Sequence, residues 1–526
     1  MGSFKRVALS GRRAMAAYLS FPALAPTTAP TPAEQLDANA DTVAAVRQRL
    51  ETPTRVSAAV TTLRAGQIGR YEPDDLSKIA NLVPGETQPA PMLQSGAQWR
   101  LVVALTIVST LAMIDKNLIQ LMVEPIKHDL GLTDVQISVL LGAAFALANI
   151  GAGLPAGWLA DRFSRKWLIG SGVVVWSLAT AGSGMASSFG WLFAARAKVG
   201  FGEGIIPPAC YSLLRGEVSP ERRGRALALY TTALTTGAGL ALIVCGALIA
   251  FITTHAMNTV PLIGTVHPWQ MALFMIGCTG LPIVLLVFTL PVGRRIQPGQ
   301  TDSSTYRDAL VFMRQHGAIL GPLLLYSIAF TMLMATMGAW VPALIGRKFG
   351  LAPQELGPIL GVMLFVCGPT GLVVVGWFTD RFNAVGKPGS AIVGIVTASC
   401  FGIAGAIMPQ VNSLPIFWCV EVLVLLTTTP FLSVTAEIVG RETPPHMVGK
   451  VMAIFLLLQG LVGLALAPTL TALLSQHLYA GRPNALGDAI STSSVFCGVV
   501  GLMMIILTFR NQRMALQRKV EAHNGV

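Results

Sequence analysis

Long apolar stretches alternate with short polar ones along the chain from Gln98 to Phe509. Twelve of these stretches have about 20 residues or more, the length that a helix needs to cross a hydrocarbon core about 30 Å thick. Every backbone polar group must be satisfied inside lipid, so runs of this length are predicted to be helices. The predicted spans are 99–123, 135–159, 166–186, 189–214, 226–252, 268–290, 318–345, 354–378, 388–408, 413–437, 448–474 and 490–509.

A seven-residue motif occurs twice, each time at the end of an apolar stretch. Residues 157–163 read Gly-Trp-Leu-Ala-Asp-Arg-Phe, residues 376–382 read Gly-Trp-Phe-Thr-Asp-Arg-Phe, and five of the seven positions are identical. A charged loop repeated between apolar spans indicates a duplicated bundle, the architecture of secondary transporters. We therefore predict an all-α membrane protein whose 12 transmembrane helices form two pseudo-symmetric six-helix bundles, residues 98–290 and 318–510.

Composition and charge agree with a multi-pass membrane protein. Only 12% of the residues are charged and 53% are hydrophobic, whereas about a quarter of a soluble protein is charged. With the N-terminus inside, the cytoplasmic loops and C-terminal tail hold 19 Lys and Arg residues and the opposite loops hold four. This asymmetry places both termini in the cytoplasm, in a plasma membrane or a bacterial inner membrane. It also explains the net charge of +12 without a nucleic acid partner, which would need a basic face on a soluble domain.

Three polar segments lie outside the spans. Residues 1–97 are rich in Ala, Thr and Pro, and we expect a largely disordered cytoplasmic tail with short helices near 34–50 and 74–82. Residues 291–317 form the predicted cytoplasmic linker between the bundles. The tail 511–526 carries basic residues and is expected to lie near anionic lipid. The seven cysteines have no metal-ligand spacing and form no disulfide framework.

Charged residues inside the spans are the main candidates for function, because charges at membrane depth are costly. Asp115 and Lys116 lie in span one, and Arg196, Lys198 and Glu203 lie in span four. The two sets overlap in depth and are predicted to pair across a shared cavity. Because Asp115 and Lys116 are adjacent, we expect one to face the cavity and the other to brace a neighbouring helix.

Helical spacing separates the span-four charges into two faces. Arg196, Gly200 and Glu203 fall at i, i+4 and i+7, on one face. Lys198 lies about 200° from Arg196 and is expected to point outward. Glu203 is hypothesised to load and release a proton as the cavity opens to each side. The alternative is that these charges are internal ion pairs that only hold the helices together.

The second half contains fewer polar groups at membrane depth. Glu421 in span ten and Gln459 in span eleven are candidates for cavity lining or for packing. Trp340, near the end of span seven, is predicted to be an interface anchor, with an aromatic cavity wall as the alternative. Charge on one wall and apolar residues on the other suit an amphipathic substrate, or a carboxylate with a hydrophobic body.

The repeated loop is predicted to act as a cytoplasmic gate. Asp161 can accept hydrogen bonds from the first amides of the next helix, while the basic residues reach carboxylates or helix C-termini. The positive-inside rule alone explains the basic residues, but it does not explain why the two copies have the same residues in the same order. The predicted gate residues are Gly157, Asp161, Arg162, Arg165, Lys166, Gly376, Asp380 and Arg381.

The motif at 157–166 resembles the loop signature of the major facilitator superfamily, and the resemblance covers about residues 99–510. Within the superfamily the chain looks most like the Spinster-like branch, on the segments 114–116, 161–166, 196–203 and 219–225 and on Trp-Val-Pro-Ala-Leu from Trp340. This resemblance implies that Arg196 and Glu203 couple protons and recognise substrate.

The chain departs from the branch at three places. Lys116 stands where the branch has Arg, which removes a guanidinium fork, and Lys198 replaces an apolar residue. Residues 447–450 depart from the family's Met-Arg-Gly-Gln pattern. Only the last of these departures concerns the second-half gate, which it puts in doubt.

The leading functional prediction is a monomeric secondary transporter that moves a small amphipathic or anionic organic molecule by alternating access. It would use a proton gradient and no bound cofactor or metal. An organic or aromatic-acid:proton symporter and a non-transporting membrane receptor on the same fold are the alternatives. An enzyme is not indicated, because the sequence has no phosphate loop after a strand, metal cluster or nucleophile–base pair.

Overall fold

The computed structural model describes residues 95–260, 264–290 and 305–524. These residues are nearly all helical, apart from a short antiparallel pair of strands, β1 and β2. The expected helices in the N-terminal tail and most of the predicted linker lie outside the described residues.

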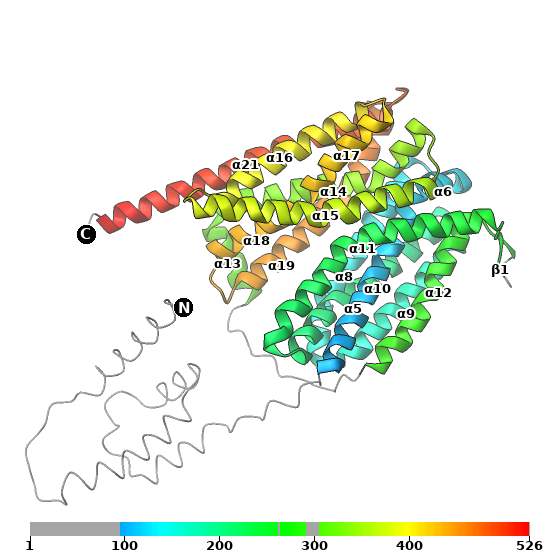
Figure 1. Cartoon of the computed structure of the whole chain (residues 1–526), viewed down its shortest axis with the longest axis horizontal. Helices are drawn as coiled ribbons and strands as arrows, with labels where there is room; N and C mark the ends of the chain where they lie inside the picture. Colours follow the sequence, from blue (N-terminus) through cyan, green and yellow to red (C-terminus); the bar gives the residue numbers. More distant parts are fainter. Residues whose placement is uncertain (1–94, 261–263, 291–304, 525–526) are drawn as a thin grey trace, which may run out of the picture. The chain divides into compact units, whose positions relative to one another are not determined.

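The elements from α5 to α12 make up what we define as the N-terminal half, residues 95–290. Figure 1 shows them gathered in one group, coloured from blue to green. Their bounds are α5 (Ser95–Leu121), α6 (Val123–Leu130), α7 (Asp134–Leu141), α8 (Ala143–Arg162), α9 (Arg165–Ser183), α10 (Phe189–Glu217), α11 (Pro220–Thr254), β1 (Thr259–Val260), β2 (Gly264–Thr265) and α12 (Pro268–Thr289).

The elements from α13 to α21 make up the C-terminal half, residues 305–524, coloured from green to red in Figure 1. Their bounds are α13 (Tyr306–Gln315), α14 (Gly317–Phe349), α15 (Pro353–Ala384), α16 (Gly389–Ile407), η2 (Met408–Gln410), α17 (Leu414–Thr428), α18 (Pro430–Glu442), α19 (Val448–Leu458), η3 (Gln459–Leu464), α20 (Ala465–Leu473), η4 (Leu474–Leu478) and α21 (Ala485–Asn524).

Each of the twelve predicted spans coincides with a helical stretch. Within the described ranges, ten stretches are long and apolar enough to cross a membrane. The helices of the third and fourth spans, α9 and α10, are not among these ten, because they are less apolar. Both carry charged and small polar residues that lower their mean hydropathy, and in α10 these include Arg196 and Glu203.

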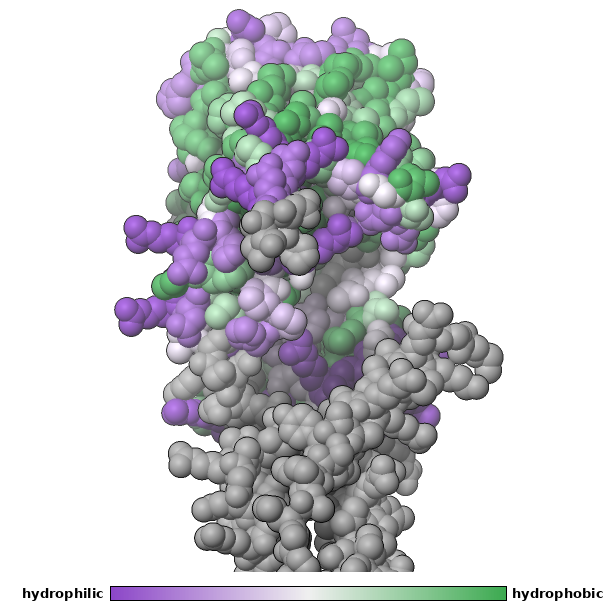
Figure 2. Space-filling view, turned by 90° about the vertical axis from the view of Figure 1, so that its left-hand side faces the viewer, coloured by the Kyte–Doolittle hydropathy of each residue, from purple (hydrophilic) through white to green (hydrophobic). Residues whose placement is uncertain are grey.

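The flanks of the helices are apolar where they are exposed. Val373 and Leu285 are 72% and 69% exposed, values that fit contact with lipid rather than with water. Figure 2 looks along the molecule onto the end at which α13 lies, and hydrophilic side chains project from the described helices there. We call this end the α13 end, and the opposite one, where α6 and β1 lie, the α6 end (Figure 1).

Several spans are interrupted for identifiable reasons. α7 begins with a capping box, in which the Thr133 hydroxyl accepts from the Gln136 amide while the Gln136 side chain accepts from the Thr133 amide. Pro430, which has no N–H, starts α18 and divides the tenth span. The eleventh span contains the π-helical segments η3 and η4, and Gln459 begins the first of them. Short π-helical segments are frequent at functional sites.

Glycines let α10 pack directly on the backbones of α8 and α9. Gly200 contacts the backbone of Phe145, and Gly204 contacts the backbone of Asn149. On the other side, a Cβ on Gly202 would lie 2.7 Å from the Gly172 carbonyl oxygen. Small residues at such contacts allow close helix approach in membranes. This packing fixes the position of the charged residues of α10.

Gly204→Ala is expected to destabilise the protein by about 1–3 kcal/mol, because the added methyl group would overlap backbone that cannot move away. The measurement is thermal unfolding of the purified protein followed by intrinsic fluorescence. Gly151→Ala in α8 is the matched control, since a Cβ there would meet no atom within 4 Å. Equal unfolding temperatures for the two variants would contradict the close packing of α10.

The two halves touch through glycines as well. A Cβ on Gly239 of α11 would lie 2.5 Å from the Phe365 amide nitrogen of α15, and one on Gly142 would lie 2.9 Å from the Ala465 carbonyl oxygen of α20. Ser138 of α7 donates a hydrogen bond to Thr469 of α20 over 3.2 Å. These contacts lie at mid-depth or nearer the α6 end.

Candidate functional site

Asp115 of α5 forms a buried ion pair with Arg196 of α10. The Arg196 Nη1 lies 2.6 Å from the Asp115 Oδ2, and the side chains are 3% and 0% exposed. Thr180 of α9 donates a hydrogen bond of 2.9 Å to the other carboxylate oxygen, Oδ1. One carboxylate thus links three helices. Removing either charge would leave the other buried and unpaired, which is strongly unfavourable.

Lys116 forms a second ion pair, with Glu203 of α10. Its Nζ lies 3.0 Å from the Glu203 Oε2, and the Lys116 and Glu203 side chains are 30% and 4% exposed. Within the part of the chain that the structure describes, the Glu203 Oε1 is buried and has no hydrogen-bond partner. This pair is therefore partly open on the lysine side and incompletely satisfied on the glutamate side.

The ring of Phe145 in α8 lies beside both cations. The Lys116 Nζ is 4.5 Å from the ring centroid, and the Arg196 Cζ is 5.5 Å from it. Contacts of this kind stabilise a cation by about 0.5–2 kcal/mol. Gly200, one turn from Arg196, lets α8 come close enough for the ring to reach them.

The predicted pairing of spans one and four is confirmed. Arg196 and Glu203 both face α5, as their spacing predicted, and Lys198 is exposed on another face. The expectation that one of Asp115 and Lys116 would face the cavity while the other braced a neighbouring helix is wrong, because both pair with α10 and neither lines the cavity described below. Their Cα–Cβ bonds diverge by about 100°, but the long lysine side chain curves back to Glu203.

A cavity of about 500 Å³ lies between the two halves. Its walls come from α5 and α11 on one side and from α14, α15, α17, α18 and η3 on the other. Glu421 and Gln459, both predicted from the sequence, line it. Asn117 and Gln120 line it too and were missed. Two further polar residues, three apart and directly after Asp115 and Lys116 in the same span, were the signal that could have found them.

The cavity is not the one expected from the charges. Its lining residues do not include Asp115, Lys116, Arg196 or Glu203. The two ion pairs lie within the N-terminal half, because α5 and α10 pack together there and their charges satisfy one another. Asn117, one residue beyond Lys116, is the point at which α5 reaches the cavity wall.

Trp340 is neither an interface anchor nor a residue of the cavity lining. Its side chain is fully buried, and its indole Nε1 donates a hydrogen bond of 3.1 Å to the Pro468 carbonyl of α20. The hydroxyls of Thr336 and Thr471, 3.2 Å apart, connect the same two helices. The interface prediction failed because α14 continues for nine residues beyond Trp340, to Phe349. The indole therefore lies inside the bundle.

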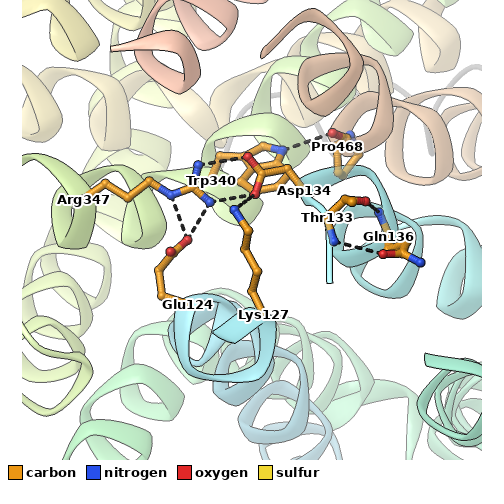
Figure 3. Close-up of polar contacts among 8 residues, drawn as sticks. All are labelled: Glu124, Lys127, Thr133, Asp134, Gln136, Trp340, Arg347 and Pro468. Carbon is orange, nitrogen blue, oxygen red and sulfur yellow. Dashed lines mark hydrogen bonds and ion pairs between the residues drawn. The ribbon is translucent and has the colours of Figure 1, made fainter. Parts of the chain in front are cut away.

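A cluster of ion pairs joins the two halves at the α6 end (Figure 3). Arg347, near the end of α14, donates from Nη2 to Glu124 of α6 over 2.6 Å. It also donates from Nη1 and Nη2 to the two oxygens of Asp134 in α7, over 2.9 and 2.8 Å. Lys127 of α6 adds a bond of 2.6 Å to Asp134. From the sequence, Arg347 and Lys127 were only two of the four basic residues counted in the loops opposite the predicted cytoplasmic side.

The repeated motif behaves differently in its two copies. Lys166 donates a bond of 2.9 Å to the Leu290 carbonyl at the end of α12, the helix C-terminus contact that was predicted. Arg165 is buried and Arg162 is exposed. The side chain of Asp161 and the surroundings of Gly157 are outside the described part of the structure.

In the second copy Arg381 lies over Trp377 of its own helix, 5.9 Å from the ring centroid, and Gly376 and Asp380 are exposed. The gate role of these residues stays a prediction.

The sequence profile of the Major Facilitator Superfamily matches residues 105–468. An MFS-type efflux pump of Mycolicibacterium smegmatis is 26% identical over 389 residues, which cover 72% of this chain and 85% of that protein. Protein spinster of Drosophila melanogaster is 24% identical over 316 residues, 58% of this chain and 49% of that protein.

A solved structure with the same fold is that of a bacterial homologue of the human lysosomal transporter Spinster, in an inward-facing and unoccupied conformation. Its TM-score is 0.68, and the match covers 81% of this chain and 99% of that one at 21% identity. At this identity the likeness shows the fold alone.

Proposed function

Because the chain belongs to the major facilitator superfamily, we propose that it is a proton-coupled secondary transporter of a small amphipathic organic molecule. The family assignment confirms the predicted fold and the resemblance to the Spinster-like branch, and it makes the chain a membrane transporter rather than an enzyme. Proton coupling, substrate class and orientation in the membrane belong to the proposal.

The observation that carries proton coupling is the pair formed by Lys116 and Glu203. A buried carboxylate with one oxygen bonded to a partly exposed lysine and the other oxygen unsatisfied can gain a proton when the lysine moves away. Asp115 differs, since both of its oxygens are bonded to groups that are themselves buried. Glu203 is therefore the proton carrier in the proposed mechanism, and Asp115 fixes Arg196 and α9 beside it.

The contacts between the halves indicate which side is closed. Glycine contacts and the Arg347 cluster hold the halves together from mid-depth to the α6 end. The positive-inside rule assigns that end to the outside. The structure then corresponds to an inward-facing state, and transport requires the Arg347 cluster to open while the α13 end closes.

A carboxylate substrate is not favoured by the site. Lys116 and Arg196 are already paired with carboxylates, and Lys198 is exposed on another face of α10. The charged residue that lines the cavity is an acid, Glu421. The paired cations and the acidic lining therefore favour a neutral or cationic substrate over an aromatic acid.

The test is proton movement in proteoliposomes that contain the full-length protein and a trapped pH dye. Pools of lysolipids, hydrophobic amines, aromatic acids and sugar acids are added separately, with protein-free vesicles as the control. A pH change caused by one pool, and only in vesicles with protein, is the expected result. No change with any pool, while radiolabelled members of a pool accumulate in the vesicles, would show transport without proton coupling.

A further inference from the structure

We propose that the cavity beside Glu421 binds an amphiphilic organic cation, a protonated amine attached to a hydrophobic body. The inference rests on the proposed transport function and names its substrate class. It depends on how the charges of the two halves are paired, on the polar groups left free in the cavity and on the cavity's apolar walls.

Charge pairing differs between the two halves. In the N-terminal half the buried carboxylates of the candidate site have cations beside them, at 2.6 Å for Asp115 and 3.0 Å for Glu203. Glu421 is 3% exposed, and its Oε2 has no hydrogen-bond partner within the described ranges. None of the described residues that line the cavity is Lys, Arg or His. A buried carboxylate needs a compensating partner, and here a cationic ligand would supply it.

A second polar group of the cavity is unsatisfied in the same way. The Gln459 Nε2, at the start of η3, is buried and makes no hydrogen bond to any described residue. Other polar side chains of the lining are already used, since Asn117, Thr331 and Thr428 each donate to a carbonyl of their own helix. Among the lining residues, the buried side-chain atoms without a described partner are thus one acceptor, on the Glu421 carboxylate, and one donor, on the Gln459 amide. An amine that also carries a hydroxyl, ether or carbonyl oxygen would satisfy both.

The remaining walls suit a hydrophobic body. Met334, Met337, Leu360, Leu364 and Phe431 line the cavity, and its volume of about 500 Å³ lies within the range of small-molecule sites. Methionine side chains are flexible and polarizable, so they adapt to ligands of different shape. An anionic ligand would bring its charge toward Glu421 with no lining cation to offset the repulsion. This argues against the anionic half of the substrate class predicted from the sequence.

The first experiment compares three radiolabelled probes that share one hydrophobic body: phenylbutylamine, phenylbutanol and phenylbutyrate. Binding is measured on the full-length protein in lipid nanodiscs, with empty nanodiscs subtracted to remove partition into lipid. We expect the amine to bind about tenfold or more tightly than the carboxylate, with the alcohol in between. Tighter binding of the carboxylate would overturn the inference.

The second experiment removes the charge that is proposed to select the amine. Glu421→Gln keeps the shape of the side chain and is expected to weaken amine binding about tenfold, with little effect on the alcohol. Glu437→Gln in α18 is the matched control, because that carboxylate is paired with Arg441 in its own helix and does not line the cavity. Unchanged amine binding in a folded Glu421→Gln protein would overturn the inference. If that variant does not fold, Glu421→Asp, which keeps the charge, must retain the preference of the wild type.

The outcomes separate this inference from the proposed function. Proton movement with a pool of acids, together with tighter carboxylate binding, would overturn the cation assignment and leave proton-coupled transport in place. Amine binding that depends on Glu421, in a protein that moves no proton and no probe, would support the site and overturn the transport proposal.

Discussion

Glu203→Gln is expected to reduce proton-coupled transport to the level of protein-free vesicles. Glutamine keeps an oxygen that can accept from the Lys116 Nζ, now 3.0 Å from the Glu203 Oε2, but it cannot take up or release a proton at any working pH. Because the change is nearly isosteric, the packing of α10 on α5 and α8 should survive. The measurement is the pH-dye assay with whichever pool is active in the wild type.

Two controls make this result interpretable. Glu221→Gln at the start of α11 removes an exposed carboxylate away from both ion pairs and should transport like the wild type. Exchange of labelled for unlabelled substrate in Glu203→Gln vesicles should continue, because exchange does not require net proton movement. Normal proton flux with the normal pH dependence in Glu203→Gln would remove Glu203 from the mechanism. Asp115 would then be the carboxylate to examine.

Arg347→Gln is expected to open the α6 end. The substitution removes the charged bonds from α14 to Glu124 and Asp134, which connect the two halves, and leaves the bond from Lys127 to Asp134 within the N-terminal half. Arg347 is 27% exposed, so its ion pairs are partly screened by solvent. Their removal should reduce the free energy that favours the closed α6 end by about 1 kcal/mol or more, roughly a fivefold shift in the ratio of closed to open protein. Spin labels introduced at His128 and Glu355, with the native cysteines replaced by serine, would report a longer distance between the halves.

Arg441→Gln is the control for this prediction, because it breaks an ion pair to Glu437 that lies within one helix, α18. It should leave the label distances unchanged. A charge exchange, Arg347→Glu with Asp134→Arg, should restore part of the closed population. Identical distance distributions in Arg347→Gln and in the wild type would mean that the glycine contacts alone hold the α6 end closed.

The sequence predicted those residues of the candidate site that stand out from their neighbours along one helix. Arg196 and Glu203 were found because charges inside an apolar span stand out, and their i, i+7 spacing on a helix places them on one face. Glu421 and Gln459 were found for the same reason. Arg347 was not, because a charged residue near the end of a span looks the same whether it faces solvent or pairs with the other half. Trp340 was misjudged because the predicted span ended at 345, whereas α14 continues to Phe349, and because the contact of its indole with Pro468 of α20 is a tertiary one.

The sequence was enough to define the twelve spans, the repeat, the family resemblance and the pairing of charges between spans one and four, but not which residue pairs with which. Each depends on hydrophobicity, charge or spacing along one or two helices, and these are local properties of the chain. Tertiary structure alone decided that the cavity borders Glu421 and Gln459 and not those ion pairs, and that Arg347 joins the two halves. The physical reason is that cavities and contacts between halves arise from packing residues hundreds of positions apart. Which polar groups that packing leaves unpaired is a property of the assembled bundle, and no single helix carries it.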